Sequence, residues 1–103
     1  MPDRYIATRV LTAHHPERGD FAVTIHIGEP YLSSDVDWAC PVALEGLYSN
    51  LAPQHGIDSW QALMLSLNLA RTLVEGFLSD GGTLIDSVTG TPLASDAFFR
   101  TGI

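Results

Sequence analysis

Four histidines and a single cysteine are the side chains of this sequence best suited to metal binding or acid–base chemistry: His14, His15, His26, His55 and Cys40. A zinc site draws its ligands from close spacings such as Cys-x-x-Cys or His-x-x-x-His, and neither spacing occurs here. Cys40 alternates with apolar residues in a predicted strand, which is typical of a small core residue and not of an exposed thiolate. The sequence therefore predicts no metal ion and no other cofactor.

Nucleophilic and acid–base catalysis also lack their usual sequence patterns. No serine stands in a Gly-x-Ser-x-Gly elbow. Asp37 and Glu45 come nearest to a carboxylate pair, but both are expected on the exposed face of a strand, where carboxylates are usually solvated. Asp58 is expected at the positive end of a helix, where it would repel a phosphate group. We therefore predict no catalytic residue and favour a protein that is not an enzyme.

A long helix is the element around which these side chains must be arranged. Asp58 suits the N-cap because its carboxylate can accept from the first-turn amides, and Gln61 three residues later completes an approximate capping box. Gly81 and Gly82 suit the left-handed conformation just past a helix end. These caps bracket about 22 residues, or roughly 33 Å of helix.

The predicted helix carries more apolar surface than packing on one sheet requires. One broad stripe is apolar, whereas the polar stripe opposite is interrupted by Met64 and Leu65. We expect either the C-terminal tail or a second subunit to cover the surplus. Gly76 inside the helix costs about 1 kcal/mol relative to alanine, and close approach of another backbone is the expected compensation. The predicted core stripe consists of Trp60, Leu63, Leu67, Ala70, Val74, Phe77 and Leu78.

Segments rich in strand-forming residues surround this helix in the sequence. Residues 4–13 and 21–27 predict an antiparallel hairpin, and residues 37–45 predict a third strand with the clearest alternation of apolar side chains. Pro41 lies inside that third strand and cannot donate to a ladder, so we expect an edge strand or a bulge there. Residues 83–88 predict a short fourth strand.

The order of these elements predicts an α+β fold. The expected architecture is an antiparallel β-β-β-α-β sheet with the one long helix packed across one face. A chain of this length forms one usable core, so we expect a single domain over residues 1–103, with residues 88–103 as a tail or short helix.

Composition and charge narrow the class of protein further. The formal net charge is −7 and the chain has no lysine, so a basic face for nucleic acid or for an anionic membrane cannot be assembled. The acidic balance suits either simple solubility or a basic protein partner. A single cysteine excludes an internal disulfide, and no apolar run follows the first residues, so we expect a cytoplasmic protein.

The start of the predicted helix carries a family resemblance. The stretch Gly56-x-Asp58-Ser59-Trp60-Gln61-Ala62-Leu63 leads into a leucine-rich helix with a Gly-Gly stop, and a Gly46-Leu47 step precedes it. These features, within residues 36–86, resemble a family of small bacterial proteins grouped as a domain of unknown function, the DUF6968 type. The resemblance implies no reaction, cofactor or catalytic residue. Some small acidic bacterial proteins of this shape are immunity proteins beside toxin genes, an analogy of fold and charge alone.

Three hypotheses about function remain open at this point. The first is a non-enzymatic interaction module, homodimeric and immunity-like, that binds a basic partner with Tyr31 as an anchor. The second is a small ligand-binding domain or enzyme with a pocket between sheet and helix, where His26, His55 or Cys40 would react. The third is a subunit that is stable only against another chain. The predicted interface consists of Glu29, Tyr31, Leu32, Asp35, Asp37, Glu45, Met64, Leu65, Phe98 and Phe99.

Overall fold

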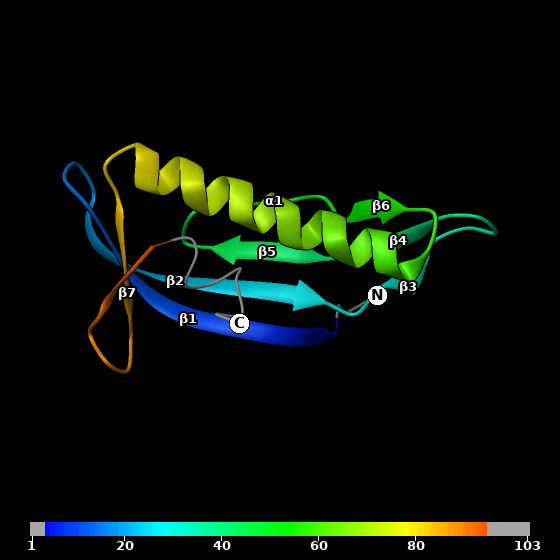
Figure 1. Cartoon of the computed structure of the whole chain (residues 1–103), viewed down its shortest axis with the longest axis horizontal. Coiled ribbons are helices and arrows are strands. Elements are labelled where there is room, and N and C mark those ends of the chain that lie inside the picture. Colours follow the sequence, from blue (N-terminus) through cyan, green and yellow to red (C-terminus); the bar gives the residue numbers. More distant parts are fainter. Residues whose placement is uncertain (1–3, 95–103) are drawn as a thin grey trace.

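Two antiparallel sheets lie against one long helix in the computed structural model, which describes residues 4–94 (Figure 1). The larger sheet has five strands in the order β5-β2-β1-β7-β8, and the smaller has three in the order β3-β4-β6. The predicted α+β class, with a helix packed on antiparallel strands, is therefore confirmed. The elements are β1 (Tyr5–His15), β2 (Gly19–Gly28), β3 (Tyr31–Leu32), β4 (Trp38–Cys40), β5 (Val42–Glu45), β6 (Gln54–Gly56), α1 (Ser59–Ser79), β7 (Thr83–Asp86) and β8 (Pro92–Leu93).

Helix α1 begins and ends where its predicted caps stand. The Asp58 carboxylate accepts a hydrogen bond from the Gln61 amide (2.7 Å), and the Gln61 side chain accepts one from the Ile57 amide (2.7 Å), so two amides at the helix start are satisfied. Beyond Ser79, Gly81 adopts a φ of +98°, the left-handed conformation that closes many helix ends. Capping chemistry alone therefore sets the bounds of this helix.

The buried face of α1 is smaller than the predicted apolar stripe. Most of the buried residues are small, which lets the strands approach the helix closely. The buried residues of α1 are Ala62, Ser66, Ala70, Val74 and Phe77. The prediction that Trp60 belongs to the core stripe is wrong, because 73% of its surface is exposed. A tryptophan does not fit where small residues set the distance between helix and strands, so it lies on the flank of the helix.

The third predicted strand is two strands in the structure, divided at Pro41. Residues 38–40 join the smaller sheet as β4, and residues 42–45 join the larger sheet as its edge strand β5. Proline has no amide hydrogen to donate, so the ladder breaks at this residue and the chain passes from one sheet to the other. The predicted irregularity at Pro41 is confirmed, but a continuous strand over residues 37–45 is wrong.

Four buried residues, Gly28, Cys40, Pro41 and Ser66, connect the two sheets and the helix at this point, and we call them the Pro41 junction. The Gly28 amide donates to the Pro41 carbonyl (2.8 Å), and the Cys40 thiol donates to the Gly28 carbonyl (3.3 Å). From the helix, the Ser66 hydroxyl donates to the Cys40 carbonyl (2.7 Å). Cys40 and Ser66 have no exposed surface, so these hydrogen bonds are shielded from water and tie β2, both halves of the divided strand and α1 together.

Three short strands lie in segments that the sequence predicts as loops or tail. β3, β6 and β8 span two or three residues each, too few for a periodicity to be read. Their pairing with neighbours creates them, because β3 and β6 flank β4 and β8 extends the sheet beyond β7. Of the predicted tail, residues 92–93 form β8, whereas Phe98 and Phe99 lie outside the described residues.

Two glycines differ sharply in the space around them. A Cβ built on Gly76 meets no atom within 4 Å apart from the backbone of its own helix, so the described chain does not supply the predicted close approach of another backbone. A Cβ on Gly28 would lie 2.6 Å from the Cβ of Pro41, inside the Pro41 junction. Only the second glycine is therefore required by packing.

Alanine at these two glycines should change stability in opposite directions. Gly28→Ala forces a methyl group against the Pro41 ring and should lower the free energy of unfolding by about 1–3 kcal/mol. Gly76→Ala restricts the unfolded chain without a clash and should raise that free energy by about 0.5–1 kcal/mol. Urea unfolding followed by tryptophan fluorescence measures both changes. An unchanged Gly28→Ala variant would contradict the tight packing of the junction.

Candidate functional site

Cys40 is buried in the Pro41 junction and is not placed for chemistry. None of its surface is exposed, and desolvation raises the pKa of its thiol above the ordinary value. Its sulfur lies within hydrogen-bonding distance of the Gly28 and Pro41 carbonyl groups, and a hydrogen bond with the Ser66 side chain offsets only part of the rise in the thiol pKa. A protonated thiol without access to solvent packs and donates weakly, so Cys40 is neither a nucleophile nor a metal ligand.

Each of the four histidines contacts one carboxylate, and the structure does not gather these pairs into a single site. Within residues 4–94, no three histidine, cysteine, aspartate or glutamate side chains come close enough together to hold a metal ion. A carboxylate on one ring nitrogen orients the imidazole and fixes its tautomer. The pairs are His14 with Asp20 (2.5 Å), His15 with Asp80 (3.2 Å), His26 with Glu45 (2.8 Å) and His55 with Asp37 (2.5 Å).

His15 is a structural residue that joins the β1–β2 turn to the end of α1. The Glu17 amide donates to its Nδ1 (3.1 Å), so the proton of the neutral ring lies on Nε2. That nitrogen faces the carbonyl and the carboxylate of Asp80, at 3.2 Å each. Phe77 packs against the ring, with centroids 5.9 Å apart. Both nitrogens are engaged within the protein, so this histidine has no position left for a ligand.

Ser33, Asp37 and His55 are the residue types of a catalytic triad, but their order is wrong for one. The Ser33 hydroxyl donates to a carboxylate oxygen of Asp37 (2.7 Å), and His55 contacts the same oxygen through Nδ1 (2.5 Å). The serine is therefore bonded to the acid and not to the base that would remove its proton. The hydrogen bond from Ser33, and after it the one from His55, holds the pKa of Asp37 below its usual value. The cluster fastens the β3–β4 hairpin to β6.

His26 belongs to a network on the sheet face turned away from α1, because its two neighbours in β2 point into the core. Its Nδ1 lies 3.0 Å from the Thr8 hydroxyl, and its Nε2 lies 2.8 Å from the Glu45 carboxylate. The Tyr5 ring stacks on the imidazole, with centroids 4.1 Å apart and planes within 6° of parallel. The network is ordered by contacts on three sides and still reaches solvent at Glu45, whose side chain is 65% exposed.

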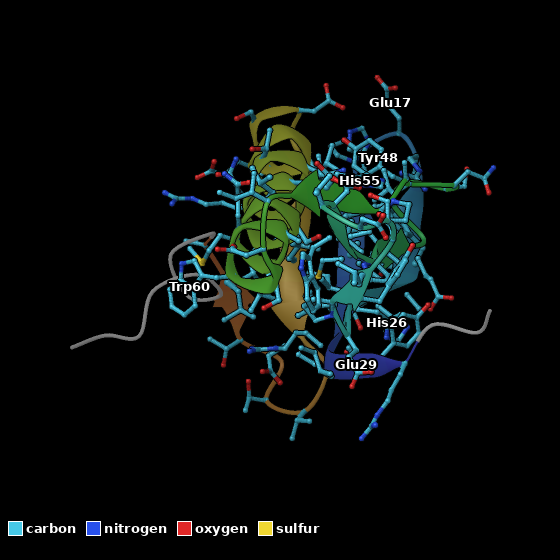
Figure 2. All side chains as sticks on the ribbon, turned by 90° about the vertical axis from the view of Figure 1, so that its right-hand side faces the viewer. Glu17, His26, Glu29, Tyr48, His55 and Trp60 are labelled. Atoms are coloured by element: carbon cyan, nitrogen blue, oxygen red, sulfur yellow. The ribbon has the colours of Figure 1, made fainter. Side chains whose placement is uncertain are left out.

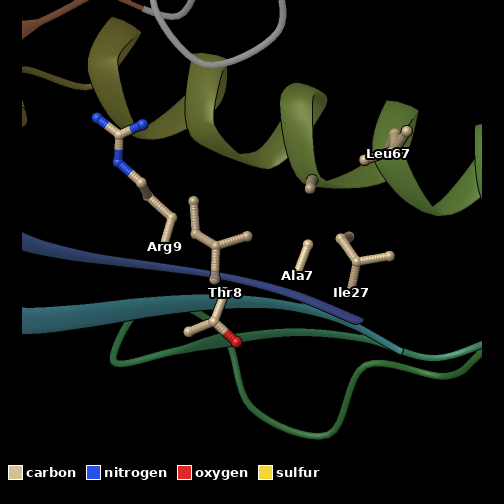
Figure 3. A pocket seen from close by; sticks show the side chains of 7 residues that line it. Ala7, Thr8, Arg9, Ile27 and Leu67 are labelled. Carbon is tan, nitrogen blue, oxygen red and sulfur yellow. The ribbon is translucent and has the colours of Figure 1, made fainter. Parts of the chain in front are cut away.

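An apolar cavity lies between α1 and the larger sheet, and we call it the α1–β1 trough. Its volume is about 170 Å³, close to the roughly 150 Å³ of a cavity that holds one benzene ring. Figure 3 shows Ala7 and Ile27 pointing toward the helix across this space. Neither a histidine nor Cys40 lines it, so the chemistry of the second hypothesis is not located there. The lining residues are Ala7, Thr8, Arg9, Ile25, Ile27, Leu67 and Ala70.

Within residues 4–94, nothing pairs with the first half of β1 on the side of the trough. β7 pairs with β1 at residues 11–14, and no strand of the described chain runs beside residues 5–8 on that side. On the helix, Trp60, Met64 and Leu67 follow at intervals of four and three residues and so share the flank above the trough. Trp60 is 73% exposed and Met64 is 48% exposed. Figure 2 shows Trp60 projecting on the helix side of the molecule, away from His26.

The predicted interface residues lie on separate parts of the molecule. Leu32 and Asp35 are exposed on the hairpin that joins β3 to β4, whereas Glu45 lies on β5 in the other sheet. Met64 and Leu65 are both partly exposed, but they point about 100° apart on α1. On or beside the smaller sheet are Glu29, Tyr31, Leu32, Asp35 and Asp37.

Sequence reasoning missed three of the most exposed apolar side chains. Ile57 is 77% exposed before the helix start, and Val36 is 82% exposed in the β3–β4 hairpin. Trp60 was missed because helical spacing alone placed it in the core. The run of small residues at Ala62, Ser66 and Ala70 was the available signal, since a face of small residues marks the side of closest approach.

The geometry defines a small α+β domain with a buried cysteine, paired histidines and one open apolar trough. Residues 7–84 match the model of the family described as a domain of unknown function, DUF6968, and the chain belongs to this family. The match confirms the resemblance carried by the helix start, and it extends that resemblance to β1 and β2. Neither a curated protein nor a solved structure matches the chain. Among the described residues, no helix is long and apolar enough to span a membrane.

The Asp37 cluster makes a specific prediction about pH dependence. The lowered pKa of Asp37 means that its ionised form is favoured by folding, so this contribution to stability is present above about pH 4 and is lost as pH falls through the lowered value. Ser33→Ala removes the largest cause and should raise the pKa of Asp37, measured by NMR titration of the carboxyl carbon. Asp86, whose pKa is lowered by separate backbone amides, should not change and serves as the internal control. An unmoved Asp37 titration would contradict the assigned cause.

Proposed function

We propose that this domain is a non-enzymatic protein-interaction module that works as a homodimer. The observation that carries the proposal is the α1–β1 trough, open at a strand edge and flanked by the exposed side chains of Trp60 and Met64. Contiguous apolar surface of this kind is typical of a protein interface. Burial of the exposed part of Trp60 alone would contribute on the order of 4 kcal/mol.

A second copy of the chain suits this surface for a geometric reason. A strand edge can pair with the same edge of its own copy in antiparallel fashion about a twofold axis, so one surface serves both partners. Residues 5–8 of β1 offer such an edge, and the trough beside them has room for an apolar side chain of the other copy. Pairing of the two edges would also satisfy backbone groups that otherwise depend on water.

We extend the proposal to a basic protein partner of the dimer, in the manner of an immunity protein. The support is the net charge of −7 together with exposed apolar side chains such as Leu32, Val36 and Ile57. We also place the protein in a bacterial cytoplasm. This assignment of a compartment rests on the free, buried Cys40 and on the resemblance of the helix start to a family of small bacterial proteins.

A charge introduced beside the trough should dissociate the proposed dimer. Met64→Glu places a carboxylate on the flank that the second copy would bury, and the cost of desolvating it should shift the population to monomer. Val88→Glu makes the same substitution at a residue that is 93% exposed in the turn between β7 and β8, and it should leave the dimer intact. Native mass spectrometry of the wild type and both variants measures the populations.

Two results would contradict this proposal. A wild-type protein that stays monomeric at every concentration would exclude self-association. A monomer that becomes dimeric after removal of residues 95–103 would show that the chain's own tail, with Phe98 and Phe99, occupies the trough instead.

A further inference from the structure

We propose that a groove beside β5 binds a cationic group, a guanidinium or ammonium carried on an alkyl chain. The groove lies between β5 and the residues that follow it, and its volume is about 460 Å³, within the range of ligand sites. The groups that argue for a cation are the Glu45 carboxylate and the rings of Tyr5 and Tyr48. The polar residues Ser49 and Asn50 also line the groove.

The anion of this site is held in place before any ligand arrives. One oxygen of Glu45, Oε2, lies 2.8 Å from Nε2 of His26. The Thr8 hydroxyl can donate to the other ring nitrogen, so a neutral His26 satisfies both contacts with its proton on Nε2. The His26 side chain is only 14% exposed and the Tyr5 ring stacks on it, which fixes its orientation. Glu45 lines the groove, and its second oxygen accepts no hydrogen bond from the described chain.

Glu45 contacts the His26 ring but no arginine of the described chain. The chain has no lysine, and each of the four arginines within residues 4–94 is engaged elsewhere. A carboxylate in a groove that contacts a histidine but neither a lysine nor an arginine, on a protein of net charge −7, therefore favours an external cation. The arginine contacts are Arg4 with Glu29 (3.6 Å), Arg9 with Asp86 (3.1 Å), Arg18 with the Gly46 carbonyl (3.1 Å) and Arg71 with Glu75 (3.4 Å).

The two tyrosines add the second element of cation recognition. Tyr5 is 44% exposed and Tyr48 is 40% exposed, so each ring keeps accessible surface while lining the groove. The electron-rich face of a tyrosine attracts guanidinium and ammonium groups, and a carboxylate nearby adds a charge-assisted hydrogen bond. Glu45 and His26 lie on the sheet face turned away from α1, whereas Tyr5 also belongs to the β1 edge of the proposed dimer surface, so the carboxylate end of the groove lies apart from that surface. A cation can come from a basic protein's side chain or from a free alkylguanidine or alkylamine.

Amide NMR spectra of the full chain, titrated with three probes, test this site. The probes are the peptide acetyl-Gly-Arg-Gly-amide, its neutral citrulline counterpart and methylguanidinium chloride. The arginine peptide should shift the amides of Ala43, Glu45 and Tyr48 in a saturable manner, and the citrulline peptide should not. Binding of the peptide much more tightly than methylguanidinium would indicate a partner's side chain, whereas equal binding would indicate a free small cation.

Three variants decide whether the groove is responsible. Glu45→Gln should weaken binding of the arginine peptide roughly tenfold, because it removes the charge and keeps the shape. Tyr48→Leu should weaken it by about two- to fivefold. Glu17→Gln removes an exposed charge in the turn between β1 and β2, outside the groove, and should leave the affinity unchanged. Equal binding by wild type and Glu45→Gln, equal binding of the citrulline peptide, or shifts scattered over every acidic residue would overturn the proposal. A monomeric wild type would not affect it.

Discussion

Pro41 has no amide hydrogen to donate to a ladder, and at this residue the chain leaves the smaller sheet for the larger one. The break falls inside the core, so the carbonyl groups around it need partners that water cannot provide. Gly28, Cys40 and Ser66 supply those partners with small side chains that fit beneath the helix. Two sheets, one helix and the end of β2 therefore meet at a single buried point.

The close packing that this junction demands shapes the rest of α1. Small residues face the strands at Ala62, Ser66 and Ala70, so the helix lies close over β4, β5 and β6. Larger apolar side chains are displaced to its flanks, and one flank overhangs the first half of β1. β7 supports β1 only at residues 11–14. The trough and the exposed Trp60 are thus consequences of where the helix is held, which is the physical basis for assigning an interface to this side.

The local elements were readable in the sequence because their causes are local. Asp58 and Gly81 fix the ends of α1, the alternation of residues 21–27 gives β2, and the missing amide of Pro41 marks the break. What the sequence did not reveal depends on long-range partners. β3 and β6 exist only through pairing with β4, and the exposure of Trp60 follows from the approach of strands to the opposite side of the helix.

The candidate sites also divide into features with local causes, which the sequence reveals, and features that depend on residues distant in the chain. The positions of His14, His15 and His55 showed that the sequence lacks a metal-ligand spacing, because such spacings are local. The pairing of His26 with Glu45 could not be read, since it joins β2 to a strand beyond the junction, 19 residues on. The trough likewise draws on β1, β2 and α1. A site assembled from three elements has no signature in any one of them.

Amide hydrogen exchange at several protein concentrations tests whether a second copy covers the open edge of β1. We expect amides of residues 5–8 to exchange more slowly as concentration rises, because the dimer pairs them. Amides of residues 11–14, already between β2 and β7, should exchange at one rate throughout. Exchange of residues 5–8 that is equally fast at every concentration would contradict the claim.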